Sequence, residues 1–248
     1  MIAIDGAFAS SIEQIDLNIR QETRLSSVPS VSGPPLPPYQ SAFDTAYPGI
    51  QLPQYGNNLY DDCVIAARAH QTVRFDYAAG KTVPNISDQD VTQEYLREIK
   101  QQGTEGLVLS TSLREWMTPG WTASGSGPRT IETFWGPYKV VNAAPNSGYP
   151  ANEMNQLQVM TSIVEYTGVQ VDLVLPPSID PRSPSTFGDG TVWSKTSGLR
   201  SNPHVMLLTG YDVNGPIGIT WGARQHMTWS FLTWCCVGLF VVQMSANT

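Results

Sequence analysis

The order of two residue patterns along the chain constrains its fold more than any other feature. Between residues 61 and 117, apolar residues recur at helical spacing. After residue 169, most apolar segments are short, alternating and rich in β-branched residues, which is typical of strands. Helices followed by a mainly antiparallel sheet predict an α+β fold: a helical lobe and a β lobe, with any cleft between them.

The first helix is expected to begin at a cysteine. Cys63 follows Asp61 and Asp62, and the apolar pattern then continues to Gly80, which predicts a helix of about 17 residues. Acidic residues are favoured at the N-terminus of a helix, and glycine is favoured just past its C-terminus.

Two further helices are expected before residue 118. The second has Ser87 or Asp88 as its N-cap, and the third has Ser110 or Ser112.

The second half of the chain predicts five strands and two helices. The strands are expected at 138–142, 169–176, 204–213, 217–221 and 237–244, and the helices at 151–168 and 227–233. A long loop rich in Pro, Ser and Gly is expected at 176–203.

The domain organisation is predicted to be an arm and one domain. Residues 1–50 contain repeated prolines with scattered aromatic and aliphatic residues, so we expect an extended arm that contacts the body or partner subunits, or crosses the cleft as a propeptide does. Residues 51–248 are expected to form the domain, with the helical lobe at about 55–118 and the mainly β lobe at about 119–248.

Charge and composition exclude several partner classes. The net charge is −7 and no Lys or Arg cluster is present, which argues against binding to nucleic acid. The longest apolar stretch, 229–244, is too short to span a membrane, and residues 1–20 lack a signal-peptide pattern, which favours a cytoplasmic or virion-associated protein. The three cysteines form no CxxC motif or disulfide framework, so neither a metal nor another cofactor is expected.

Cys63 is the candidate nucleophile. The free N–H groups and the dipole at the start of a helix favour a thiolate, although an isolated cysteine among apolar residues is more often an inert core residue. Asn57 lies six residues upstream in a Gly-Asn-Asn turn, from which its amide can point at the thiol. Asn57 is therefore a candidate donor to an oxyanion.

His204 is the candidate base. It lies 141 residues after Cys63 and opens the clearest strand of the second half, so it is expected to face the cleft from the β lobe. Trp221 and Gly222 lie on the following strand, where an indole can shield the pair from water. We expect the Cys63 and His204 side chains to approach within about 4 Å.

These segments resemble those of small papain-like proteins of bacteria and phages. GNNLYDDCVIAARAH is similar to their GNDxxGDCxxAAxAH segment, and HVMLLTGYDVNGPIGITWGARQHMTWSFL is similar to their HAVxxVGYD…TWGxxQxMTWxF segment. The resemblance covers residues 55–244 and implies a papain-like fold with an active-site cleft. It implies Cys63 as nucleophile, His204 as base and Asn57 at the oxyanion position; the Cys–His separation is within the roughly 130–150 residues of papain-like enzymes.

The chain departs from this pattern at two positions. Ile219 stands where papain-like peptidases carry the Asn that orients the histidine, so the third member is missing or comes from elsewhere. Asp61 stands where the relatives carry Gly, and with Asp62 it opposes formation of a thiolate.

Three functions remain open from the sequence. The leading hypothesis is a cysteine hydrolase, of the peptidase type, acting on a protein, a peptide or a peptidoglycan cross-bridge. The second is a catalytically weak or inactive papain-like scaffold with a structural role, for example in a phage virion. The third is another acyl-transfer enzyme, transglutaminase-like or an amidase, using the same residues.

Several other reactive residues are assigned no catalytic role. His70 is expected on the surface or between the lobes, and His226 is a minor alternative base. Cys235 and Cys236 are interpreted as buried inert thiols, and Asp212 as a turn former.

Overall fold

The computed structural model describes residues 52–103, 106–123, 128–142 and 152–245. The predicted arm, residues 1–50, lies outside the described residues. The helices are α3 (Cys63–Ala78), α4 (Asp88–Gln102), α5 (Leu109–Met117), α6 (Gln156–Glu165), α7 (Trp229–Cys235) and the short 3₁₀ helix η1 (Pro184–Thr186). The strands are β1 (Ile131–Val141), β2 (Glu153–Asn155), β3 (Val169–Leu175), β4 (Val192–Trp193), β5 (Asn202–Tyr211), β6 (Pro216–Thr220), β7 (Ala223–Met227) and β8 (Cys236–Met244).

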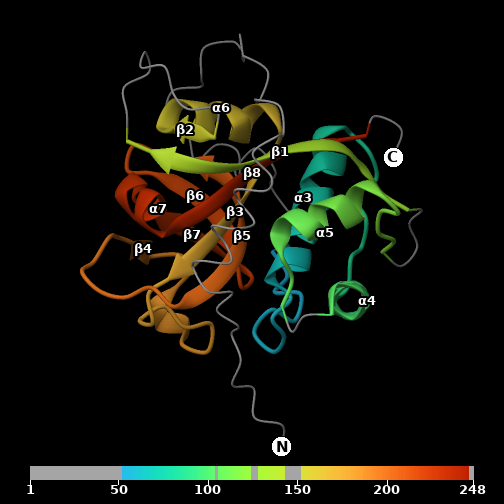
Figure 1. The fold of residues 1–248 in the computed structure, drawn as a ribbon, viewed down its shortest axis with the longest axis horizontal. Coiled ribbons are helices and arrows are strands. Elements are labelled where there is room, and N and C mark those ends of the chain that lie inside the picture. Colours follow the sequence, from blue (N-terminus) through green and yellow to red (C-terminus); the bar gives the residue numbers. More distant parts are fainter. Residues whose placement is uncertain (1–51, 104–105, 124–127, 143–151, 246–248) are drawn as a thin grey trace, which may run out of the picture.

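The strands form one eight-stranded sheet in the order β2-β1-β8-β3-β5-β6-β7-β4. The β1–β2 and β4–β7 pairs are parallel and the other neighbours are antiparallel. Figure 1 shows α3, α4 and α5 grouped on one side of this sheet. The α+β prediction, with helices first and a mainly antiparallel sheet second, is confirmed.

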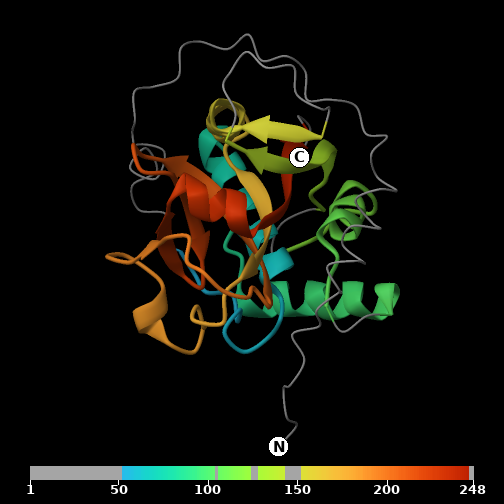
Figure 2. The same cartoon turned by 60° about the vertical axis from the view of Figure 1, so that its left-hand side comes forward.

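Apolar side chains fill both faces of the sheet. Alternate residues of β5 divide between two clusters: Val205 and Leu207 pack with α3, α4 and α5, whereas Met206 and Leu208 pack with α6 and α7. Figure 2 shows the helices around the sheet from a second direction. A strand that is buried on both faces has apolar residues at consecutive positions, as VMLL does within β5.

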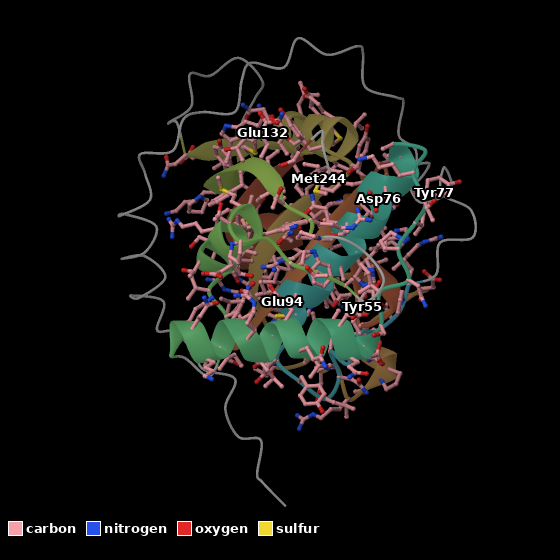
Figure 3. The ribbon with its side chains drawn as sticks, turned by 90° about the vertical axis from the view of Figure 1, so that its right-hand side faces the viewer. Tyr55, Asp76, Tyr77, Glu94, Glu132 and Met244 are labelled. Carbon is pink, nitrogen blue, oxygen red and sulfur yellow. The ribbon has the colours of Figure 1, made fainter. Side chains whose placement is uncertain are left out.

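A buried arginine ties the first three helices together. Arg68 on α3 lies 3.0 Å from Glu94 and 2.7 Å from Glu98, both on α4, and it donates to the backbone and hydroxyl oxygens of Ser112 on α5. Its guanidinium also lies 5.4 Å from the centroid of the Trp116 ring. Figure 3 views this side, with Glu94 labelled on α4 and α3 running obliquely behind.

The helix caps were predicted correctly for α4 and wrongly for α5. Ser87 caps α4 in a reciprocal pair with Asp90, where each side chain accepts from the other residue's backbone N–H. The N-cap of α5 is Val108, and Ser110 and Ser112 lie inside the helix. Ser112 bonds to Arg68 instead, so a tertiary contact overrides its local preference for a cap.

Tertiary pairing also shifts elements of the second half. Residues 153–155, predicted as helix, form β2, and Asn155 then caps α6. β1 starts at Ile131 rather than 138 because it pairs with β8 along its length. The predicted loop 176–203 contains η1 and β4.

Candidate active site

Cys63 is the first residue of α3, and its sulfur contacts β5. Asp62 occupies the N-cap position but its side chain makes no capping hydrogen bond. Cys63 is partly buried, and its Sγ accepts a hydrogen bond from the backbone N–H of Val205 at 3.4 Å. The fold therefore places the thiol directly against the residue that follows His204.

His204 is buried in β5 and contacts both a hydroxyl and an indole. Its Nε2 lies 2.6 Å from Oγ1 of Thr220, the last residue of β6. Its ring lies against Trp221, with centroids 4.4 Å apart and planes inclined by 32°. The expected contact of Trp221 with the histidine is present, and the two partners limit how the ring can turn.

Strand alternation explains why Thr220, not Ile219, reaches the histidine. Ile219 pairs with Leu207 across the β5–β6 ladder, so the two side chains share the face that packs on α3. His204 is three residues from Leu207 and faces the opposite side. Thr220, one residue after Ile219, shares the face of His204. Sequence reasoning missed Thr220, although the period-two alternation of this segment is the signal that points to it.

Asn57 lies in a turn that is attached to the Trp221 region. Tyr55 and Gly56 have positive φ angles of 57° and 79°, and the Asn57 N–H donates to Gln54 O at 3.1 Å. A Cβ at Gly222, where φ is 76°, would lie 3.1 Å from Leu52 O and 3.3 Å from the Gln54 Cβ. The chain leading to Asn57 is therefore packed against the turn that follows β6. The role of Asn57 as an oxyanion donor stays a prediction, as does the 4 Å approach of Cys63 to His204.

The environment of the two candidate catalytic groups favours their neutral forms. Burial raises the pKa of Cys63 to about 12; the Val205 N–H opposes this effect, and Asp62, Asp172 and Asp61 add to it. Burial also lowers the pKa of His204 to about 3. A neutral thiol and a neutral imidazole are the forms that these shifts favour at neutral pH.

Two carboxyl groups near the thiol are themselves perturbed. Asp62 is fully buried and, among the described residues, neither of its carboxyl oxygens has a hydrogen-bond partner. Burial raises its pKa to about 8, with smaller contributions from Asp88 and Asp61. Burial also raises the pKa of Asp172, on β3, to about 7. Sequence reasoning noted Asp61 and Asp62 but missed Asp172, an acidic residue inside a mainly apolar strand.

The other two histidines are accounted for by neighbours outside the Cys63 region. His70, expected on the surface or between the lobes, is not on the surface: it is buried with its ring 4.8 Å from that of Tyr55. His226 lies on β7 with Nδ1 3.4 Å from the Asp212 carboxylate. Asp212 accepts from the N–H groups of Asn214 and Gly215, which confirms its role in the turn.

The two remaining thiols differ in exposure. Cys235 is buried, as expected, and burial raises its pKa to about 12. Cys236 is only partly buried, and burial raises its pKa as well. In the part of the chain that the structure describes, no group of three or more His, Cys, Asp or Glu side chains is placed to hold a metal ion. Within the same ranges, no helix is long and apolar enough to cross a membrane.

Comparisons with known proteins support the fold. No protein-family model matches the chain, and neither does any curated protein sequence. Among solved structures, the chain is similar to the cysteine protease and lectin-like domains of Cwp84, a surface layer associated protein of Clostridium difficile. The TM-score is 0.58 at 8% sequence identity, and the match covers 96% of this chain and 60% of that one.

This similarity shows a papain-like α+β fold. At 8% sequence identity it shows the fold and nothing about activity. The chain spans less than two thirds of the length of the Cwp84 structure.

Proposed function

We propose that this protein is a papain-like cysteine hydrolase of the peptidase type, with Cys63 as nucleophile and His204 as base. The observation that carries the proposal is the 3.4 Å hydrogen bond from Val205 to the Cys63 sulfur, which joins the start of α3 to the strand that holds His204. The contacts of His204 with Thr220 and Trp221 support it, because a base must be oriented to accept a proton efficiently.

The tautomer of His204 determines how it acts. When Nε2 donates its proton to Thr220 Oγ1, Nδ1 is left as the acceptor for the thiol proton. Because the environment favours two neutral groups, the proton moves as the sulfur attacks the amide carbonyl. The imidazolium then protonates the leaving amine, and a water molecule, deprotonated by His204, hydrolyses the thioester. The Cys63 N–H and the Asn57 amide are the proposed donors to the oxyanion.

A second function is favoured by the electrostatics of the site. The raised pKa of Cys63 and the lowered pKa of His204 both oppose an ion pair, which suits a scaffold without efficient turnover. Such a protein would have a structural or interaction role, for example in a phage virion. A transglutaminase-like or amidase activity would use the same residues as the hydrolase.

Thiol labelling combined with an activity assay separates these functions. The full-length protein is treated with iodoacetamide at pH 7 and pH 9, and each cysteine is quantified by peptide mapping. A hydrolase predicts preferential labelling of Cys63 over Cys235, and slower Cys63 labelling in His204→Ala. It also predicts cleavage of a peptide library, a denatured protein or peptidoglycan that Cys63→Ala abolishes.

The scaffold predicts that labelling of Cys63 is independent of His204 and that no substrate is cleaved. Release of an amine without cleavage of a polymer chain would indicate the amidase or transferase activity.

A further inference from the structure

A carboxylate on β3 lies near the candidate nucleophile and has no cationic partner among the residues that the structure describes. Asp172 pairs in register with Val205 of β5, whose N–H is bonded to the Cys63 sulfur. Side chains of directly paired residues in an antiparallel ladder lie about 5 Å apart on the same face. Asp172 is thus the cross-strand neighbour of the residue that touches the thiol.

The alternation of β3 fixes the direction of this side chain. Val171 and Leu173 belong to the cluster on the α6 and α7 face, so Asp172 points to the face of α3. Gln170, two residues earlier, confirms the direction, because its amide donates to Gln71 of α3 at 2.8 Å. The Asp172 side chain therefore shares the α3 face of the sheet with that of Val205, whose backbone N–H is bonded to the Cys63 sulfur.

Nothing on the neighbouring strands neutralises this carboxylate. The register partners of Asp172 are Val205 and Gly238, neither of which carries a polar side chain. Throughout the described ranges, no Lys, Arg or His forms an ion pair with Asp172. Asp172 is also partly exposed.

An unpaired and partly buried carboxylate beside a nucleophile is costly unless a proton or a ligand neutralises it, and burial raises the pKa of Asp172 to about 7. Burying a charge without a partner costs several kcal/mol, and a cation from a bound ligand removes that cost. It also removes a negative charge that opposes formation of the thiolate.

We infer that Asp172 is a specificity-determining residue that binds a lysine or arginine side chain of the substrate next to the scissile amide. The inference rests on the proposed function, since it names the substrate class of that site. In the complex, the ammonium or guanidinium group pairs with the carboxylate while the adjacent carbonyl lies at Cys63. Substrates with an apolar side chain in this place leave the carboxylate unpaired and bind more weakly.

Charged thiol reagents test the inference without requiring turnover. The full-length protein is treated with the cationic 2-aminoethyl, the anionic 2-sulfonatoethyl or the neutral methyl methanethiosulfonate, and the rate of Cys63 modification is measured by peptide mapping. We expect Cys63 to react about tenfold faster with the cationic reagent than with the anionic one, after each rate is divided by the rate of that reagent with a free thiol. Asp172→Asn should bring this rate ratio close to one. The rate with the neutral reagent should stay within about twofold of its value in the unmodified protein.

Asp61→Asn is the matched control. It makes the same change of charge beside Cys63 but at an exposed position, where water and salt screen the charge. The ratio should therefore change by less than about twofold in this variant. If Asp172→Asn does not fold, Asp172→Val replaces it, because valine suits a buried strand.

The outcomes separate the inference from the proposed hydrolase. Any one of three results overturns the inference. They are a cationic-to-anionic rate ratio near one in the unmodified protein, an equal change of this ratio in Asp61→Asn, and failure of all three reagents to modify Cys63. Cleavage of peptides together with a ratio near one overturns only the role of Asp172. An Asp172-dependent ratio in a protein that cleaves no peptide supports a cation site beside Cys63 and contradicts the hydrolase.

Where peptides are cleaved, pairs that differ only in lysine or norleucine near the scissile bond extend the test. The expected result is a KM about tenfold lower for the lysine peptide, a preference that Asp172→Asn removes. Equal KM values for the two peptides in the unmodified protein contradict the inference.

Discussion

At the scale of single residues, the contact to His204 comes from a hydroxyl, whereas papain-like peptidases carry an amide for this purpose. Thr220 Oγ1 lies 2.6 Å from His204 Nε2, whereas Ile219 is on the other face of β6. The hydroxyl can accept a hydrogen bond from Nε2–H, which leaves Nδ1 basic, but it can also donate to Nε2 in the other tautomer. Because it can play either part, the hydroxyl fixes the tautomer less firmly than a group that only accepts.

Thr220→Val tests this role because it removes the hydroxyl and keeps the shape. We expect kcat/KM to fall about tenfold, which corresponds to the loss of one hydrogen bond of about 1.4 kcal/mol. Thr220→Ser should retain most of the activity. The kinetic measurement is paired with NMR of the His204 ring protons, since a change of tautomer alters their shifts.

Ile219→Val is the control for this pair of strands. It should leave the tautomer and kcat/KM unchanged, because Ile219 faces α3 rather than His204. If Thr220→Val matches this control in both measurements, the hydroxyl does not orient the base.

At the scale of elements, a buried ionic cluster holds α3, and so Cys63, in place. Arg68 and Glu98 are almost wholly buried and joined at 2.7 Å, and Glu94 contacts both Arg68 and Arg97. The cluster connects α3 and α4, and the hydrogen bonds to Ser112 extend it to α5. Removing one member leaves a buried charge without a partner, which is more damaging than losing a surface ion pair.

Arg68→Leu should lower the free energy of unfolding by about 3–5 kcal/mol, because the buried Glu98 is left with only the more distant Arg97 at 3.5 Å. Urea unfolding followed by circular dichroism measures this change. Arg182→Leu breaks an ion pair with Asp180 on an exposed loop and should change the free energy of unfolding far less, because water and salt screen exposed charges. Similar losses in the two variants would contradict the importance of the buried cluster.

The turn after β6 is a second element that positions the site. Gly222 combines a φ of 76° with close contact to residues 52 and 54, so Gly222→Ala should cost about 1–2 kcal/mol and loosen the segment that leads to Asn57. Limited proteolysis near residue 54, together with urea unfolding, measures both effects.

Gly190→Ala is the matched control for this turn. Gly190 has a φ of 91° with nothing within 4 Å of an added Cβ, so it isolates backbone strain from the contact. Equal proteolysis in the two variants would show that the contact does not hold the segment.

At the scale of the whole molecule, acidic groups near Cys63 should make stability depend on pH. The folded pKa of Asp62 is raised from 3.8 to about 8, so between these values the folded state binds more protons than the unfolded state. The free energy of unfolding must then fall as pH rises through this window. Asp172, with a pKa raised to about 7, acts in the same direction.

Asp62→Asn should flatten this dependence because the amide does not titrate. Urea unfolding from pH 5 to pH 8 should show a shallower decline than in the unmodified protein, where one group contributes up to about 1.4 kcal/mol per pH unit. Asp189→Asn changes an exposed carboxyl and should leave the slope unaltered. An unaltered slope in Asp62→Asn would show that Asp62 is solvated in the folded protein.

Local signals in the sequence determined the class of fold and the start of the key helix. Helical spacing before residue 118 and β-branched alternation after residue 169 are short-range properties, and both are confirmed in the structure. The N-terminus of α3 at Cys63 follows equally from neighbouring residues. Local patterns carry this information because helix and strand periods are set by the backbone.

Tertiary structure decided what lies around the candidate pair. The register of β5 with β6 selects Thr220 over Ile219, and the register of β3 with β5 brings Asp172 beside the thiol. Ser112 is taken from its expected capping role by Arg68, which lies 44 residues away. Pairing register depends on contacts between segments far apart in the chain, and a shift of one residue would turn each of these side chains to the opposite face.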